Sequence, residues 1–375
     1  MKGIAILGST GSIGRQTLEV ISSFPQHFSV VALGGWRNMG LLREQAEEFR
    51  PALVCGKDLG SQAVLPGFGK AVSATMEEMV YHPKVDVVVV ATAGPAALIP
   101  TLQALRARKA VALASKEVLV AAGAIIAKER AAGATLLPID SEASAIWQCL
   151  QGEDDNVSRV IITASGGPFR TKPLAELATV TSEEALKHPT WRMGKKITVD
   201  SATLMNKAFE VIEAHLLFQV PWERIEVVLH PQSIVHSMVE FRDGSVKAQM
   251  APPDMRLPLQ YALFYPQRLP TPGLERLDIA KLGCLTFEAL DLERYPCFSI
   301  GMQAAKTGGT YPAALCAADD VAVRLFLEGE AGFTDIPHLI QRVLDEHVSG
   351  SADSLEDVIA ADAWARRRTL ELARA

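Results

Sequence analysis

The first residues of the chain predict a strand, a glycine-rich turn and a helix. Ile4–Leu7 is a short apolar run, and Gly8, Gly11 and Gly14 follow it with two residues between successive glycines. Glycines in such a turn let the backbone approach a pyrophosphate group at the start of the next helix. We therefore expect an α/β fold with a dinucleotide site, although a structural turn in another α/β domain would show the same spacing.

Further strands are predicted after this turn, and helical segments separate them. This alternation is typical of a parallel sheet built from βαβ units, so we expect an N-terminal Rossmann-like domain. The predicted strands cover residues 28–33, 52–55, 85–91 and 111–114.

The end of the second strand bears on the choice of cofactor. An NAD enzyme usually has Asp or Glu there to bind the ribose hydroxyls, whereas residues 34–38 contain no acid and include Arg37. A guanidinium suits the 2′-phosphate of NADP, so NADP is the predicted cofactor. Arg37 could also be a solvated loop residue.

Polar residues follow two other strands. Lys116 comes just after residues 111–114, at the carboxyl end where ligands of open parallel sheets bind, although an ordinary Lys–Glu pair at a helix start would look the same. Ser165 follows a strand at 160–162 among small residues that allow close ligand approach, and its hydroxyl could donate to a phosphate oxygen. A plain Gly-Gly-Pro turn is the alternative there.

Asp140 and Glu142 follow a strand predicted over residues 135–139. If the strand continues, both side chains project from one face, and neighbouring carboxylates repel unless a cation or a proton joins them. With Glu210 they would form an oxygen shell that favours Mg²⁺ or Mn²⁺ over zinc. Surface acids beside a turn are the competing interpretation.

The segment 195–213 is predicted to contain the central helix of the site. Asp200 or Ser201 should cap its start after the β-branched run 197–199, and the backbone donors there would suit an anion. One apolar stripe is expected to face the core, namely Met205, Ala208, Phe209, Ile212 and Leu216. A second stripe is polar and comprises Thr203, Asn206, Lys207 and Glu210. A solvated ion pair is the ordinary interpretation of that stripe.

The loop 188–196 precedes this helix and carries Trp191. A large apolar side chain on a loop beside a ligand site suggests a lid that excludes water on closure. Core packing of Trp191 would produce the same pattern.

The rest of the chain predicts strands, a linker and helices. His230 and His236 lie near these strands and are interpreted as satisfied polar residues rather than metal ligands. Strands are predicted at 225–229, 234–241 and 245–250, irregular structure up to about residue 295, and helices from 296 to 375.

Composition excludes several classes of protein. The formal net charge of −6 gives no support to nucleic-acid or acidic-membrane binding. The longest apolar run, residues 87–100, is too short to span a membrane. The five cysteines lack zinc spacing, and the N-terminus lacks a signal-peptide pattern, so we expect a cytoplasmic protein with reduced thiols.

Taken together, five motifs resemble the 1-deoxy-D-xylulose 5-phosphate reductoisomerase family over nearly the whole chain. They are the segments 8–14, 116–117, 140–142, 165–169 and 199–207. The resemblance implies NADPH-dependent rearrangement and reduction of a phosphosugar in isoprenoid precursor synthesis, one divalent ion (Mg²⁺, Mn²⁺ or Co²⁺) and a cytoplasmic homodimer. It also implies an NADPH-binding domain at 1–139, an α+β catalytic and dimerisation domain at 140–263 with a lid loop at 185–196, a linker at 264–295 and a helical domain at 296–375.

The resemblance implies a role for each matching residue. The metal ligands would be Asp140, Glu142 and Glu210, which together with Lys116 form the catalytic set. Substrate contacts would be Lys116, Ser141, Glu142, Ser165, His188, Trp191, Ser201, Asn206, Lys207 and Glu210. Cofactor contacts would be Thr10, Gly11, Ser12, Ile13, Gly35, Trp36, Arg37, Asn38, Ser115, Glu117 and Gly194. Trp36, Ser115 and Ala164 depart from the family's usual residues and affect only the expected cofactor affinity and loop detail.

Two rival functions remain at this point. Another NADP enzyme, such as a semialdehyde or homoserine dehydrogenase, would explain the N-terminal half but not three carboxylates beside a phosphate pocket. A nucleotide-sensing module would need only the glycine turn.

Overall fold

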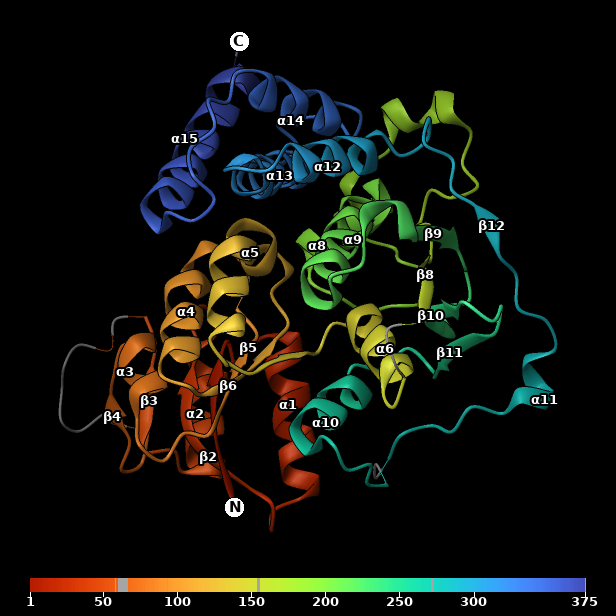
Figure 1. Cartoon of the computed structure of the whole chain (residues 1–375). Coiled ribbons are helices and arrows are strands. Elements are labelled where there is room, and N and C mark those ends of the chain that lie inside the picture. The colour runs from red at the N-terminus through yellow and green to blue at the C-terminus, as the bar shows by residue number, and fades with distance from the viewer. Residues whose placement is uncertain (58, 60–66, 93, 154–155, 271–272, 375) are drawn as a thin grey trace. The chain divides into compact units, whose positions relative to one another are not determined.

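The computed structural model describes residues 1–375 except 58, 60–66, 93, 154–155, 271–272 and 375 (Figure 1). Contacts along the chain divide it into two compact units. The first unit comprises Met1–Val118, Ile126–Ser144 and Asp254–Glu275. The second unit comprises Leu119–Ile125, Ala145–Pro253 and Arg276–Ala375.

The first unit contains a parallel sheet of seven strands in the order β4-β3-β2-β1-β5-β6-β7. Its strands are β1 (Lys2–Leu7), β2 (Phe28–Gly34), β3 (Leu53–Cys55), β4 (Val72–Ser73), β5 (Val87–Val90), β6 (Ala110–Leu113) and β7 (Leu136–Pro138). Strand order reverses beside β1, which pairs with both β2 and β5, and ligands bind at such a switch point in open α/β sheets. The predicted Rossmann-like domain is therefore confirmed.

Helices connect these strands, as the alternating pattern predicted. They are α1 (Ser12–Ser23), α2 (Met39–Phe49), α3 (Met76–Tyr81), η1 (Pro95–Ala97), α4 (Leu98–Arg106) and α5 (Lys116–Ala131). The central strands β1, β2 and β5 are almost fully buried, as expected when helices cover both faces of a parallel sheet, whereas Val72 of the edge strand β4 is 42% exposed.

A late segment of the chain also belongs to the first unit. Helix α10 (Arg256–Phe264) returns to α1, and the Phe264 ring packs edge-on against Phe24 and Phe28, with ring centroids 4.8 Å apart in both pairs. Residues 254–263, which the predicted boundaries placed in the middle domain, thus pack with the N-terminal sheet. The contact joins positions more than two hundred residues apart, so no local pattern could reveal it.

The second unit is built on a mixed sheet of five strands in the order β11-β10-β8-β9-β12. They are β8 (Val157–Ala164), β9 (Ile225–Leu229), β10 (Val235–Phe241), β11 (Val246–Met250) and β12 (Glu288–Ala289). The first four match predicted strands. The segment predicted as an irregular linker instead supplies β12, which pairs with β9, and the short helix α11 (Ile279–Leu282).

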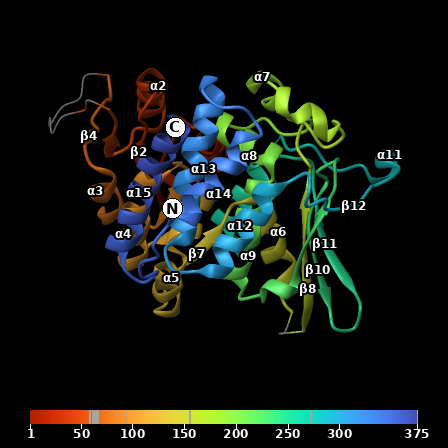
Figure 2. The same cartoon turned by 90° about the horizontal axis from the view of Figure 1, so that it is seen from above.

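Helices pack against this sheet on one side, and the helices from residue 296 onward form the C-terminal bundle (Figure 2). They are α6 (Ser141–Leu150), η2 (Leu174–Thr179), α7 (Ser182–Ala185), α8 (Lys195–Thr203), α9 (Met205–Phe218), η3 (Trp222–Arg224), α12 (Pro296–Thr307), α13 (Tyr311–Glu328), α14 (Asp335–Asp345) and α15 (Leu355–Arg374), of which α6 begins in the first unit. The predicted helical tail is confirmed. Within the described residues, the helices include none with the length and apolar character needed to cross a bilayer.

The predicted apolar stripe of α9 lies in the core of the second unit. Met205, Ala208, Phe209 and Ile212 are buried there together with residues of α12 and α13. Gly301 of α12 allows this approach, because a Cβ at that position would lie 2.7 Å from the Ala208 Cβ. Helix α9 is consequently held firmly, and its polar stripe is presented at a fixed position.

Candidate functional site

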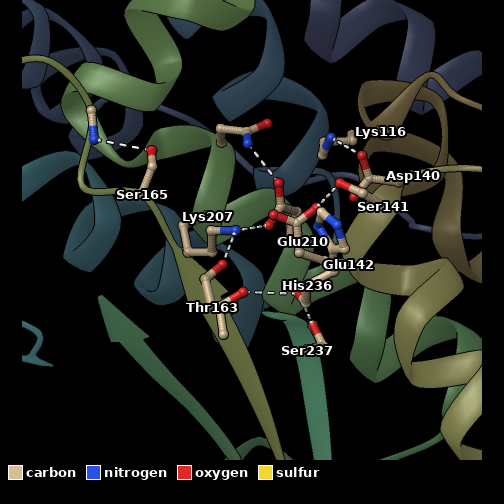
Figure 3. Close-up of polar contacts among 12 residues, drawn as sticks. Lys116, Asp140, Ser141, Glu142, Thr163, Ser165, Lys207, Glu210, His236 and Ser237 are labelled. Carbon is tan, nitrogen blue, oxygen red and sulfur yellow. Dashed lines mark hydrogen bonds and ion pairs between the residues drawn. The ribbon is translucent and has the colours of Figure 1, made fainter. Parts of the chain in front are cut away.

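A first cluster of predicted site residues lies at the carboxyl ends of β6 and β7. These neighbouring parallel strands end at Leu113 and Pro138, and their chains continue into Lys116 and Asp140. The Lys116 ammonium forms an ion pair with the Asp140 carboxylate, and both side chains are less than a tenth exposed (Figure 3). A buried pair of this kind places a fixed proton donor beside a fixed carboxylate.

The predicted reason for grouping Asp140 with Glu142 is wrong. The strand ends at Pro138 and α6 begins at Ser141, so the two acids do not alternate along a strand. Glu142 instead lies in the first helical turn, where a negative charge is favoured, and it accepts a hydrogen bond of 2.5 Å from the Ser141 hydroxyl.

A second cluster of predicted site residues lies on α9 and β8, in the second unit. The Lys207 ammonium pairs with the Glu210 carboxylate and donates to the Thr163 carbonyl at 2.6 Å. Asn206 Nδ2 donates to Glu210 Oε1 at 2.5 Å. Figure 3 shows Lys207 between Glu210 and Thr163. Lys207 and Glu210 are almost fully buried, so this pair is not the solvated ion pair of an ordinary surface helix.

Asn206 offers a hydrogen-bond acceptor that a ligand could use. Its Oδ1 atom is buried and has no hydrogen-bond partner among the described residues. A buried acceptor left without a partner is costly, so this oxygen is suited to accept a hydrogen bond from a bound hydroxyl group.

Ser165 and His188 form a polar pair whose proton positions follow from their contacts. The backbone N–H groups of Thr190 and Trp191 both donate to His188 Nδ1, at 3.2 and 2.9 Å. The ring proton is therefore on Nε2, which donates to the Ser165 hydroxyl at 2.9 Å. Burial lowers the pKa of His188 to about 4, so the ring is neutral at physiological pH.

The Ser165 hydroxyl is left as a donor. It already accepts hydrogen bonds from His188 and from the Gly167 backbone at 3.2 Å. Both oxygen lone pairs are used in this way, so its hydrogen is available for an acceptor such as a phosphate oxygen.

The predicted helix start at Asp200 or Ser201 is wrong. Helix α8 begins at Lys195 and ends at Thr203, which places Ser201 in its last turn rather than at an N-terminus. Leu204 then adopts a left-handed conformation with φ of 57°, and α9 begins after it. The β-branched run is helical because Thr198 and Val199 are buried in the core, and tertiary packing overrides their weak helix propensity.

The loop between α7 and α8 is attached to the second unit by several contacts. Trp191 is half-buried, and its ring lies 6.0 Å from the His236 ring. Thr190 Oγ1 contacts Ser233 Oγ at 3.1 Å. Trp191 is thus packed against its own unit, and these contacts are what a lid movement would have to break.

Asp319, a residue that sequence reasoning missed, supports α8 through Lys196. Lys196 contacts Asp200 at 2.6 Å and Asp319 of α13 at 2.7 Å, and both acids are almost fully buried. The C-terminal bundle therefore fixes the helix that carries Ser201. Asp319 is far away in sequence and has no motif, so no sequence signal pointed to it.

The glycine turn of the first unit has the geometry that its spacing predicted. Gly8 has a positive φ of 96°, and a Cβ at Gly14 would collide with the backbone of Gly8 and Ser9. The start of α1 has no acidic residue in its first turn and no side-chain cap, so its backbone N–H groups suit an anion.

The predicted cofactor residues are distributed over both units. Gly35 is buried against Thr10, whereas Trp36, Arg37 and Asn38 are exposed. Ser115 is buried as the N-cap residue of α5 and donates to Glu117 at 3.3 Å. All of these residues and the glycine turn belong to the first unit, and Gly194 alone among the predicted cofactor contacts belongs to the second.

A dinucleotide-binding sheet, together with buried acid–lysine pairs at strand and helix ends, is typical of an NAD(P)-dependent oxidoreductase. The comparisons with known proteins narrow this class. Family models for 1-deoxy-D-xylulose 5-phosphate reductoisomerase match residues 4–123, and models of its C-terminal domains match residues 136–218 and 250–368. The chain belongs to the 1-deoxy-D-xylulose 5-phosphate reductoisomerase family, as its motifs predicted.

Individual relatives match this chain over nearly their full length. The 1-deoxy-D-xylulose 5-phosphate reductoisomerase of Pelotomaculum thermopropionicum is 51% identical, and the match covers 100% of this chain and 99% of the relative. A solved structure of the Zymomonas mobilis enzyme in complex with NADPH is 42% identical with a TM-score of 0.92, over 100% of this chain and 99% of that one. A reductoisomerase structure with NADPH, fosmidomycin and magnesium is 37% identical with a TM-score of 0.94, over 100% and 98%.

Proposed function

We propose that this protein converts 1-deoxy-D-xylulose 5-phosphate into 2-C-methyl-D-erythritol 4-phosphate, using NADPH and one divalent ion. The observation that carries the proposal is the pair of buried half-sites, Lys116–Asp140 and Lys207–Glu210, each held by its own unit. The chain's relatives at about half identity bear the name of this activity.

The carboxylates fit a hard divalent ion. Asp140, Glu142 and Glu210 offer oxygen ligands only, and Asp140 and Glu210 are buried. Mg²⁺ and Mn²⁺ prefer such ligands, and Co²⁺ also accepts them. We propose that the two half-sites close on one ion, which would polarise the substrate carbonyl and align the neighbouring hydroxyl.

The chain's own polar groups would position the substrate and supply protons. Lys116 and Lys207 each present an ammonium fixed by a carboxylate, and either can donate to a substrate oxygen on which negative charge develops. Asn206 would accept from a substrate hydroxyl, and Ser165 would donate to a phosphate oxygen. Ser201, His188 and Trp191 complete the proposed pocket, and closure of the Trp191 loop would exclude water. NADPH supplies the hydride that reduces the rearranged aldehyde.

NADPH is proposed to lie across the first unit. Its pyrophosphate would meet the segment Thr10–Ile13, and Arg37 with Asn38 would bind the adenosine 2′-phosphate. Gly35, Trp36, Ser115, Glu117 and Gly194 are the further proposed contacts. The absence of an acid beside Arg37 supports NADPH over NADH.

We also propose that the protein acts as a cytoplasmic homodimer. Strand β11 lies at an edge of its sheet and exposes nearly half of Val246, which suits a second copy of the chain. The cysteines are all free and four of the five are buried, as expected in a reducing compartment.

Oxidation of NADPH should depend on both the phosphoketose and a divalent ion. With Mg²⁺, 1-deoxy-D-xylulose 5-phosphate is expected to cause steady loss of NADPH absorbance, and a chelator should abolish it. With the unphosphorylated sugar, the enzyme should show both a lower kcat and a weaker affinity, because remote phosphate binding supports closure of the site. Oxidation of NADPH with aspartate semialdehyde but not with the phosphoketose would favour the rival dehydrogenase, and no oxidation with any substrate would favour a sensor.

A further inference from the structure

Two buried side chains outside the proposed cofactor contacts join the glycine turn to α2. The Ser9 hydroxyl donates to Gln45 Oε1 at 2.8 Å, and Gln45 Nε2 donates to the Ser9 carbonyl at 3.0 Å. Ser9 is completely buried and Gln45 is 5% exposed. The amide oxygen and the amide nitrogen of Gln45 are therefore both hydrogen-bonded to one residue of the turn.

The turn is also fixed to the end of β2. The backbone N–H groups of Gly8 and Ser9 both donate to the Gly34 carbonyl, at 2.9 and 2.7 Å. Gly35 is packed so closely on Thr10 that a Cβ there would lie 2.9 Å from the Thr10 side chain. These contacts hold the turn against Gly34 and Gly35, whereas Arg37 and Asn38 lie beyond them along the chain.

Helix α2 completes the connection. Asn38 caps its first turn by accepting from the Leu41 backbone at 3.0 Å, and Arg37 immediately precedes this cap. Leu42 is fully buried and lies near Gly35. Because a short helix moves as a rigid element, a shift at Gln45 would carry Asn38 and Arg37 with it.

We infer that Gln45 is a positioning residue for NADPH, which sets the spacing between the pyrophosphate turn and the residues that recognise the 2′-phosphate. It touches no part of the cofactor and acts through Ser9 and α2. The inference rests on the proposed function, because the assignment of Arg37 to the 2′-phosphate belongs to that proposal. Its consequence is that Gln45 should affect the preference for NADPH over NADH, rather than dinucleotide binding in general.

The test is equilibrium titration of NADPH and NADH into metal-free wild type and Gln45→Met. The Met side chain keeps the volume of Gln and removes both hydrogen bonds. We expect the Kd for NADPH to rise about tenfold, which corresponds to about 1.4 kcal/mol, whereas the Kd for NADH changes less than about twofold. In steady state, KM for NADPH should rise similarly while kcat at saturating NADPH stays within about twofold.

Three further variants make the result specific. Ser9→Ala removes one of the two bonds and should give a smaller loss, and the double variant should be no worse than Gln45→Met, because both residues act in one interaction. Gln260→Met is the matched control. Gln260 is another buried amide of the first unit, whose Nε2 donates to the Leu269 carbonyl at 2.7 Å, and its loss should leave both Kd values unchanged.

The inference is overturned if Gln45→Met binds NADPH as tightly as wild type, or if it loses NADPH and NADH equally. If Gln45→Met does not fold, Ser9→Ala tests the inference instead, by whether its Kd for NADPH rises more than its Kd for NADH. Failure of the proposed function looks different, because wild type itself would then show no preference for NADPH or no turnover of the phosphoketose. A wild type without that preference would overturn the inference as well.

Discussion

Replacing Glu210 by glutamine is expected to reduce kcat by about a thousandfold or more, with the fold and NADPH binding retained. Glutamine keeps the size of the side chain but removes the charge that would help to hold the divalent ion. The ion's stabilisation of charge in the transition state is worth several kcal/mol, which corresponds to this loss. The buried Lys207 would keep its bond to the Thr163 carbonyl at 2.6 Å, so the local structure should persist.

Steady-state rates across a range of Mg²⁺ concentrations, NADPH titration and thermal unfolding measure these outcomes together. Glu213→Gln is the matched control, since Glu213 is an equally buried carboxylate on the same helix and lies outside the proposed shell. It should retain turnover within about tenfold of wild type. Turnover of Glu210→Gln at the wild-type level would remove Glu210 from the metal site.

Replacing Lys116 by methionine is expected to lower the free energy of unfolding of the metal-free protein by about 3–5 kcal/mol, because it leaves the Asp140 carboxylate buried without its lysine partner. A divalent ion would restore positive charge beside Asp140. Mg²⁺ should therefore stabilise Lys116→Met more than it stabilises wild type. Turnover should fall even with Mg²⁺, because the proposed proton donor is gone.

Urea unfolding with and without Mg²⁺ measures both effects. Lys109→Met is the control, because Lys109 is a partly buried lysine of the same unit whose ammonium donates to the Val85 carbonyl at 2.6 Å. Lys109→Met should lower the free energy of unfolding by about 1 kcal/mol and should show the wild-type response to Mg²⁺. An equal response to Mg²⁺ in wild type and Lys116→Met would mean that the ion does not bind at Asp140.

Features fixed by local sequence were predictable. The glycine turn and the alternation of strands and helices depend on neighbouring residues, and the structure has both. The apolar stripe of α9 was predictable for the same reason, since its period follows from helical geometry.

Features fixed by distant contacts were not predictable. The start of α8 was misplaced because Val199 has a strand-like side chain, and only its burial in the core makes it helical. Glu142 shares a strand face with Asp140 only if the strand continues, whereas β7 ends at Pro138 and Glu142 lies in α6. The backbone carbonyl of Thr163, which holds Lys207, is a contact that no side-chain pattern can reveal.

The position of the metal is measured most directly in crystals grown with Mn²⁺ and NADPH, where anomalous scattering locates the ion independently of the protein. The predicted result is one ion in the site, with oxygen atoms of Asp140, Glu142 and Glu210 at about 2 Å and the nicotinamide ring nearby. An ion bound by other residues, or by the first unit's carboxylates with Glu210 far from it in the closed protein, would contradict the proposal that both half-sites serve one metal.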